Sequence, residues 1–217
     1  MKVIITGATG MVGEGVLHTC LNSPDVDSVL SVSRKPVGFE NKKLKELITD
    51  DYFNLGGFEE ILTGYDACFF CLGISSVGVD KKSYYRTTYE LTMNFGRIIS
   101  GLNKDMVMIY VSGAGTDGTE KGRLEWARVK GKTENDLMKL PFKRVYAYRP
   151  GFIKPIPGLK RAHKFYKYIN WLYPAGKALF PESFNTLEEV GLSMINISGS
   201  NYEESVITGR DITRLAR

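Results

Sequence analysis

The sequence has few of the residues on which several protein classes depend. Only three cysteines and two histidines occur among its 217 residues. Three cysteines are too few for a disulfide scaffold. Two histidines offer little material for a histidine metal site or for the catalytic triad of a hydrolase. We therefore expect no metal. No apolar run reaches the roughly 18 residues of a membrane-spanning helix. Because no secretory signal precedes the first apolar segment, Val3 to Ile5, the sequence predicts a cytoplasmic protein.

Two of the cysteines, Cys68 and Cys71, have the C-x-x-C spacing of redox-active pairs. They lie in an apolar run from Ala67 to Leu72, which is typical of a buried strand. Side chains three positions apart in a strand point to opposite faces of the sheet. We therefore interpret both as buried, reduced thiols.

The chain has enough apolar sequence for one compact core, since 43% of its residues are hydrophobic and 24% are charged. The alternation of apolar runs with helical stretches is typical of βαβ units. Strands are predicted at Lys2 to Ile5, Ser28 to Ser33, Leu47 to Thr49, Ala67 to Leu72, Met106 to Val111, Val145 to Tyr148 and Ser205 to Ile207, and helices at Met11 to Leu21, Phe58 to Leu62, Tyr84 to Leu102 and Leu124 to Leu140. We predict a doubly wound α/β fold of the Rossmann type over residues 1–217, with a small cap at about 152–190.

The net charge of +5 is concentrated late in the chain. Residues 141–181 contain no Asp or Glu but include Lys143, Arg144, Arg149, Lys154, Lys160, Arg161, Lys164, Lys167 and Lys177. This basic segment, 143–177, could attract an anionic substrate, a membrane surface or a protein partner. Within it, Phe165, Ile169, Leu172 and Tyr173 recur at helical spacing, either as core contacts under the cap or as an amphipathic face. No recognised module indicates nucleic-acid binding, and nothing indicates an oligomeric state.

A glycine-rich turn joins the first predicted strand to the first predicted helix. Gly7 permits the sharp turn, Gly10 lets the backbone approach a pyrophosphate, and Gly13 lets helix and strand pack closely. The helix N-terminus offers unpaired N–H groups and a partial positive charge to an anion. The pattern predicts a dinucleotide site that includes Thr9, Met11 and Val12 together with the three glycines.

The residues about 20 positions after the glycines, at the end of the second strand, determine whether such a site prefers NAD or NADP. NAD-binding proteins usually have a carboxylate there, but this chain has Ser33, Arg34 and Lys35. Two cations can pair with a 2′-phosphate, so the sequence favours NADP(H), with NAD(H) as the alternative. Asp50 and Asp51, after the third strand, are placed to accept a hydrogen bond from an adenine amino group.

Several motifs together resemble the atypical short-chain dehydrogenase/reductase superfamily, including its epimerase-like, NmrA-like and Tat-interacting-protein-like members. They are Thr-Gly-Ala-Thr-Gly-Met-Val-Gly (6–13), Cys-Leu-Gly (71–73), Ser-Gly-Ala-Gly (112–115), Val-Lys-Gly-Lys-Thr-Glu (129–134) and Arg-Pro-Gly (149–151). The resemblance implies that the nucleotide lies along the carboxyl edge of the sheet. It also implies that Cys71, Leu72 and Gly73 back the cofactor and that Pro150 and Gly151 lie near the nicotinamide.

The superfamily's catalytic set, a serine followed by Tyr-x-x-x-Lys, matches this chain only in part. Ser112 and Lys130 correspond to the serine and the lysine, but Trp126 stands where the tyrosine is expected. An indole N–H can donate a hydrogen bond but does not titrate as a phenol does.

Three accounts of Trp126 remain open. The tyrosine function is lost, leaving Lys130 to hold the nicotinamide ribose; another hydroxyl, from Tyr84, Tyr85 or Tyr89, replaces it; or Trp126 only packs and the predicted helix register is wrong. The sequence accordingly predicts an NADPH-dependent oxidoreductase or epimerase-like enzyme acting on a small carbonyl or hydroxyl substrate. The alternative is a dinucleotide-binding regulatory protein that senses redox state.

Overall fold

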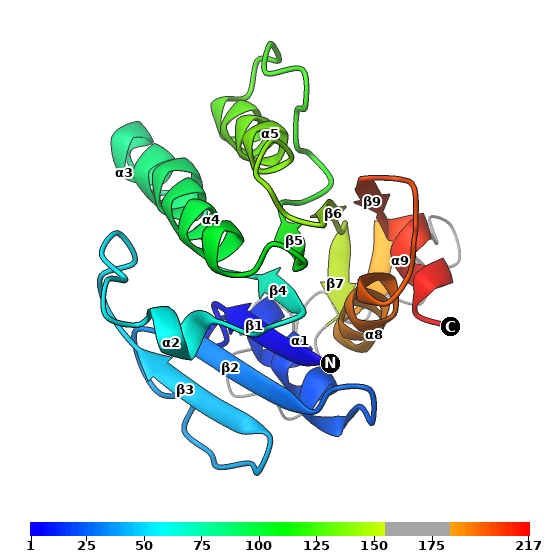
Figure 1. Cartoon of the computed structure of the whole chain (residues 1–217). Coiled ribbons are helices and arrows are strands. Elements are labelled where there is room, and N and C mark those ends of the chain that lie inside the picture. The colour runs from blue at the N-terminus through cyan, green and yellow to red at the C-terminus, as the bar shows by residue number, and fades with distance from the viewer. Residues whose placement is uncertain (155–182) are drawn as a thin grey trace.

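A computed structural model describes residues 1–154 and 183–217 (Figure 1). Its centre is a parallel sheet of seven strands in the order β3-β2-β1-β4-β5-β6-β9. The strands are β1 (Lys2–Thr6), β2 (Ser28–Ser33), β3 (Leu44–Ile48), β4 (Ala67–Phe70), β5 (Val107–Val111), β6 (Arg144–Arg149) and β9 (Val206–Thr208). The predicted α/β fold with a doubly wound parallel sheet is confirmed.

The central strands are mostly buried because helices cover both faces of the sheet. In β4, for example, every residue is buried. The edge strand β3 differs, since Lys45 and Glu46 are exposed. These charges explain why the sequence predicted only Leu47 to Thr49 there, whereas the strand begins at Leu44.

Helices form a layer on each face of the sheet (Figure 1). The core on one face includes Leu17, Val190 and Ile212 from α1 (Met11–Asn22), α8 (Leu187–Ser198) and α9 (Gly209–Leu215). The core on the other face includes residues of α2 (Glu59–Leu62), α4 (Leu91–Leu102) and α5 (Glu125–Leu137). Cys68 belongs to this second core while Cys71 packs against the first, so the two thiols point to opposite faces as predicted.

The helical stretch predicted from Tyr84 to Leu102 begins earlier and is not uniform. It consists of α3 (Lys81–Tyr85), a π-helical turn η1 (Arg86–Glu90) and α4. The start is set by Asp80, whose side chain accepts a hydrogen bond from the Ser83 backbone N–H at 3.0 Å.

The segment after β6 departs most from the sequence analysis, which did not predict α8 or α9. Residues 187–190, assigned to the cap, open α8 instead, and Leu187 packs against α1 at Gly15. Two short strands of the cap region, β7 (Phe152–Lys154) and β8 (Phe184–Thr186), pair in parallel. The rest of the cap and most of the basic segment lie outside the described residues. Within the described ranges, no helix has the length and apolar character needed to cross a membrane.

Candidate functional site

Two glycines where β1 passes into α1, one in the turn and one in the first turn of the helix, have no room for a side chain. Gly7 has a φ of 70°, and a Cβ there would lie 2.7 Å from the backbone of Leu72. A Cβ on Gly13 would lie 2.2 Å from the carbonyl oxygen of Gly7. The turn is closed by a hydrogen bond from the Gly10 N–H to that same carbonyl, at 2.8 Å. These contacts fix the start of α1 beside the end of β4.

A pocket of about 170 Å³ opens at this turn, at the carboxyl ends of β1, β2 and β4. This position is where the strand order reverses direction, the usual ligand crevice of an open α/β sheet. The pocket is lined by Gly7, Thr9, Gly10, Ser33, Arg34, Tyr52, Cys71, Leu72 and Gly73. Eight of these nine residues were predicted to contact a dinucleotide, and they come from three segments far apart in the sequence.

Other residues predicted for the cofactor do not line this pocket. Met11 and Val12 begin α1, and Lys35 is exposed beyond the end of β2. Asp50 and Asp51 are exposed after β3. The Asp51 carboxylate accepts the Phe53 backbone N–H at 2.9 Å and so stabilises its own loop. Their contacts with a cofactor stay predictions.

Tyr52 is a lining residue that the sequence analysis missed. Its hydroxyl donates to the Val32 carbonyl at 2.7 Å. Burial raises the pKa of this hydroxyl, and the charge of Arg34, which lines the same pocket, opposes that rise. The sequence offered one signal for Tyr52, namely its position directly after Asp50 and Asp51, which were themselves predicted to contact the cofactor.

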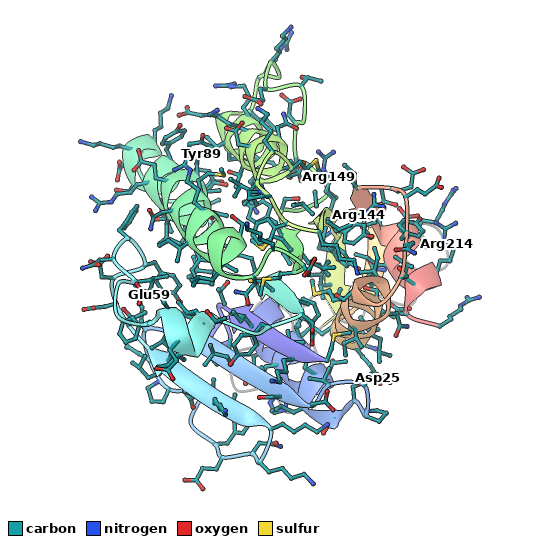
Figure 2. All side chains as sticks on the ribbon, viewed as in Figure 1. Asp25, Glu59, Tyr89, Arg144, Arg149 and Arg214 are labelled. Carbon is teal, nitrogen blue, oxygen red and sulfur yellow. The ribbon has the colours of Figure 1, made fainter. Side chains whose placement is uncertain are left out.

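The Ser112 hydroxyl, predicted to line the active site, is held by a buried carboxylate. It donates to Glu134 Oε1 at 2.5 Å. Glu134 is 1% exposed, and its carboxylate accepts hydrogen bonds from Nε and Nη2 of Arg149 at 3.0 and 2.5 Å. Arg149, labelled in Figure 2, was counted in the basic segment, but its charge is paired inside the protein. The sequence analysis gave neither Glu134 nor Arg149 a role in this site.

Lys130 and Trp126 lie one turn apart on α5, so the predicted helix register is correct. The Lys130 ammonium donates to the Ser112 carbonyl oxygen. Burial lowers the pKa of Lys130, and the nearby Glu134 charge partly offsets this by raising it. The Trp126 indole covers Gly115, where a Cβ would approach the ring to 2.5 Å. Trp126 therefore packs on the turn that follows Ser112.

The three tyrosines considered as replacements differ in their surroundings. Tyr89, on the far side of α5 from Arg149 in Figure 2, donates its hydroxyl to Asp136 at 2.7 Å. The Tyr85 ring packs against it at 4.9 Å between centroids. Tyr84 is buried, and this burial raises the pKa of its hydroxyl.

Pro150 and Gly151 are tied to neighbouring segments by their backbones. The Ala114 N–H donates to the Pro150 carbonyl at 3.0 Å, which joins the end of β6 to the turn after Ser112. A Cβ on Gly151 would lie 2.4 Å from the Ser183 carbonyl oxygen. The structure thus brings the Ser112 turn, α5 and the end of β6 to the same edge of the sheet as the pocket.

The residues present fit a dinucleotide. The glycines let a pyrophosphate approach the backbone at the N-terminus of α1, a twelve-residue helix whose first N–H groups lack intrahelical acceptors. Arg34 lies where the adenosine ribose would bind in such a fold. Among the described residues there is no cluster of three or more potential metal ligands.

Comparisons with known proteins agree with this geometry. A family model described as "NAD dependent epimerase/dehydratase family" matches residues 3–148. The protein Fmp52, mitochondrial, of Aspergillus clavatus is 29% identical over 70% of this chain, and the match covers 66% of that relative's length, just under two thirds. FMP52-2, mitochondrial, of Scheffersomyces stipitis is 26% identical over 98% of this chain and 96% of its own length. The structure of MoeE5 in complex with UDP-glucuronic acid and NAD has a TM-score of 0.68 at 15% identity, covering 100% of this chain and 81% of MoeE5.

These relatives correct one expectation of the sequence analysis. The cytoplasmic location predicted from the lack of a visible signal is contradicted, because both Fmp52 relatives are named as mitochondrial proteins. The apolar segment at the start of the chain is the buried strand β1 and did not report where the protein is located.

Proposed function

Because the chain belongs to the NAD dependent epimerase/dehydratase family, we propose that it binds a nicotinamide dinucleotide, NADP(H) in preference to NAD(H), and acts on a small carbonyl or hydroxyl substrate. The observation that carries this proposal is the pocket at the carboxyl edge, where the glycine turn, the end of β2 and the end of β4 converge. MoeE5, which shares the fold, is named as a complex with NAD.

Each part of the site has a role in this proposal. The α1 N-terminus and the glycine turn would hold the pyrophosphate, and Cys71, Leu72 and Gly73 would back the cofactor. When bound, a nicotinamide supplies or accepts the hydride. Ser112 and Lys130, at the same edge, would orient the substrate and the ribose, near Pro150 and Gly151. By its charge, the basic segment, 143–177, would attract an anionic substrate or a peripheral partner, although most of it lies outside the described residues.

The preference for NADP(H) depends on Arg34. Replacing it (Arg34→Ala) should raise the dissociation constant of NADPH by about 10- to 100-fold, since a hydrogen bond between charged groups contributes roughly 1.5–3 kcal/mol. NADH lacks the 2′-phosphate, so its binding should change by less than about threefold. Fluorescence titration of the purified protein with each nucleotide measures both values.

Lys35→Ala is the matched control, because Lys35 is also cationic but does not line the pocket. It should raise the dissociation constant of NADPH by no more than about threefold, through a long-range charge effect that salt screens. If Arg34→Ala weakened the two nucleotides equally, the assignment of the 2′-phosphate site would be wrong. If neither nucleotide saturated the wild-type protein at millimolar concentration, the proposed function itself would fail.

A second candidate function is favoured by Trp126. Its ring packs on Gly115 at the position of the superfamily's titrating tyrosine, as expected if the protein binds the dinucleotide to report redox state to a partner. This regulatory hypothesis predicts that the wild-type protein binds NADPH but does not oxidise it in the presence of any carbonyl compound. Steady-state NADPH oxidation distinguishes it from the enzyme.

A further inference from the structure

Hydride transfer to a carbonyl requires a proton for the oxygen, and the usual donor is absent. An indole N–H does not ionise in the range in which enzymes work. Trp126 is also fixed by packing over Gly115. If the proposed function holds, another group at this edge has to supply the proton.

The other hydroxyls and the thiol near the edge are poorly suited to this role. Ser112 has one proton, which it donates to Glu134. Tyr89 donates its proton to Asp136. Burial moves the pKa of Tyr84 further above neutrality and raises that of the Cys71 thiol to about 12.

Lys130 is suited to it. Its ammonium is half-buried beside Ser112, and one N–H is used by the Ser112 carbonyl. An ammonium has three N–H donors, and among the described residues only the Ser112 carbonyl is hydrogen-bonded to it, which leaves two N–H groups for a substrate. Lys130 also lies four residues after Trp126, on the same side of α5.

The electrostatic surroundings favour a lysine that can lose its proton. Burial is the larger effect and lowers the pKa of Lys130 toward the neutral range. Among the described residues, the charged group that acts on it is Glu134, one turn further along α5, which opposes the shift. Arg149 of β6 neutralises much of that carboxylate's charge, because it binds both of its oxygens.

We propose that Lys130 is itself the general acid and base of this site, in place of the missing tyrosine. The proposal rests on the proposed function. In carbonyl reduction the carbonyl carbon receives the hydride that a bound nicotinamide would supply, the π electrons of the carbonyl bond move to the oxygen, and the oxygen takes a proton from the Lys130 ammonium. The N–H bond breaks and leaves its electron pair on nitrogen, an O–H bond forms, and the neutral amine regains a proton from water. In alcohol oxidation Lys130 accepts the proton.

This role sets the direction of the pH dependence. Reduction requires the ammonium, so its rate should fall as the pH rises through the pKa of Lys130. Oxidation requires the neutral amine and should rise over the same interval. Since burial lowers the pKa of Lys130, both transitions should lie below the ordinary lysine value of about 10.4.

The decisive comparison uses variants that separate charge from proton transfer. Lys130→Arg keeps a cation that can hold ribose hydroxyls but does not deprotonate. We expect it to bind NADPH within about threefold of the wild type and to lower kcat by 100-fold or more, the scale of general acid catalysis. The assay follows NADPH oxidation with 4-nitrobenzaldehyde and 9,10-phenanthrenequinone as carbonyl probes. Circular dichroism melting confirms that each variant is folded.

Two further measurements exclude a structural role. In Lys130→Ala, added primary amines of different basicity should restore turnover, with a rate that depends on the pKa of the amine. If the amines only filled the cavity left by the side chain, the restored rate would depend on their size instead. In the protein without nucleotide, NMR titration of ¹³C-methylated lysines should show one resonance with a lowered pKa that is absent from Lys130→Arg.

The results separate two claims, the acid–base role of Lys130 and the proposed function of the protein. Turnover retained by Lys130→Arg would overturn the lysine role, as would turnover seen only after Trp126→Tyr. NADPH binding without turnover in the wild type and in Trp126→Tyr would also overturn it and would favour the regulatory function. Failure of the wild type to bind NADPH would instead reject the proposed function.

Discussion

Gly13→Ala is expected to destabilise the protein by about 3 kcal/mol and to raise the NADPH dissociation constant by on the order of a hundredfold. The added Cβ would lie 2.2 Å from the Gly7 carbonyl oxygen and 2.9 Å from the Ala8 nitrogen, both of them backbone atoms that cannot rotate away. The start of α1 would have to move away from β1. The N–H groups proposed to bind the pyrophosphate would move with it.

Gly73→Ala provides the control for the stability measurement. Gly73 lines the same pocket, but a Cβ there would meet no atom within 4 Å. Urea unfolding followed by circular dichroism should give a free energy of unfolding within about 0.5 kcal/mol of the wild type for Gly73→Ala. Equal unfolding midpoints for the two variants would show that the close approach at Gly13 is not needed for the fold.

Glu134→Ala should be similarly destabilising, by about 3 kcal/mol, because it breaks a buried charge pair by removing one partner. The Arg149 side chain is only 21% exposed and would keep its charge without a counterion. The Ser112 hydroxyl would also lose its acceptor. For a chain of this size, such a loss corresponds to a fall in Tm of roughly 6–12 °C, which differential scanning calorimetry measures directly.

The exposed ion pair between Lys81 and Glu125 is the matched comparison. Its two side chains are 83% and 37% exposed, and exposed pairs contribute less than about 1 kcal/mol. Glu125→Ala should therefore shift Tm by no more than about 3 °C. If removing Glu134 cost no more than removing Glu125, the Ser112–Glu134–Arg149 network would not be structurally important.

Much of the fold could be predicted from the sequence because a parallel sheet leaves a strong pattern. Strands covered on both faces appear as continuous apolar runs, as at Ala67 to Phe70. The pattern weakened at the edge strand β3, where Lys45 and Glu46 face solvent. It also failed for α8 and α9, which follow a segment rich in proline, glycine and basic residues. The Thr186 and Glu189 capping box at the start of α8 was the available signal.

The sequence by itself determined the glycine-rich turn, since the spacing of Gly7, Gly10 and Gly13 expresses a local steric requirement between a strand and the helix that follows it. By motif it also predicted that Ser112 and Lys130 belong to the catalytic set, and their roles stay predictions. Only the tertiary structure showed that Glu134 accepts a hydrogen bond from the Ser112 hydroxyl and that Arg149 pairs with Glu134. Glu134 lies 22 residues from Ser112 and 15 residues from Arg149 in the chain. They meet because β5 and β6 pair in parallel and α5 connects these two strands, a proximity that local sequence pattern does not encode.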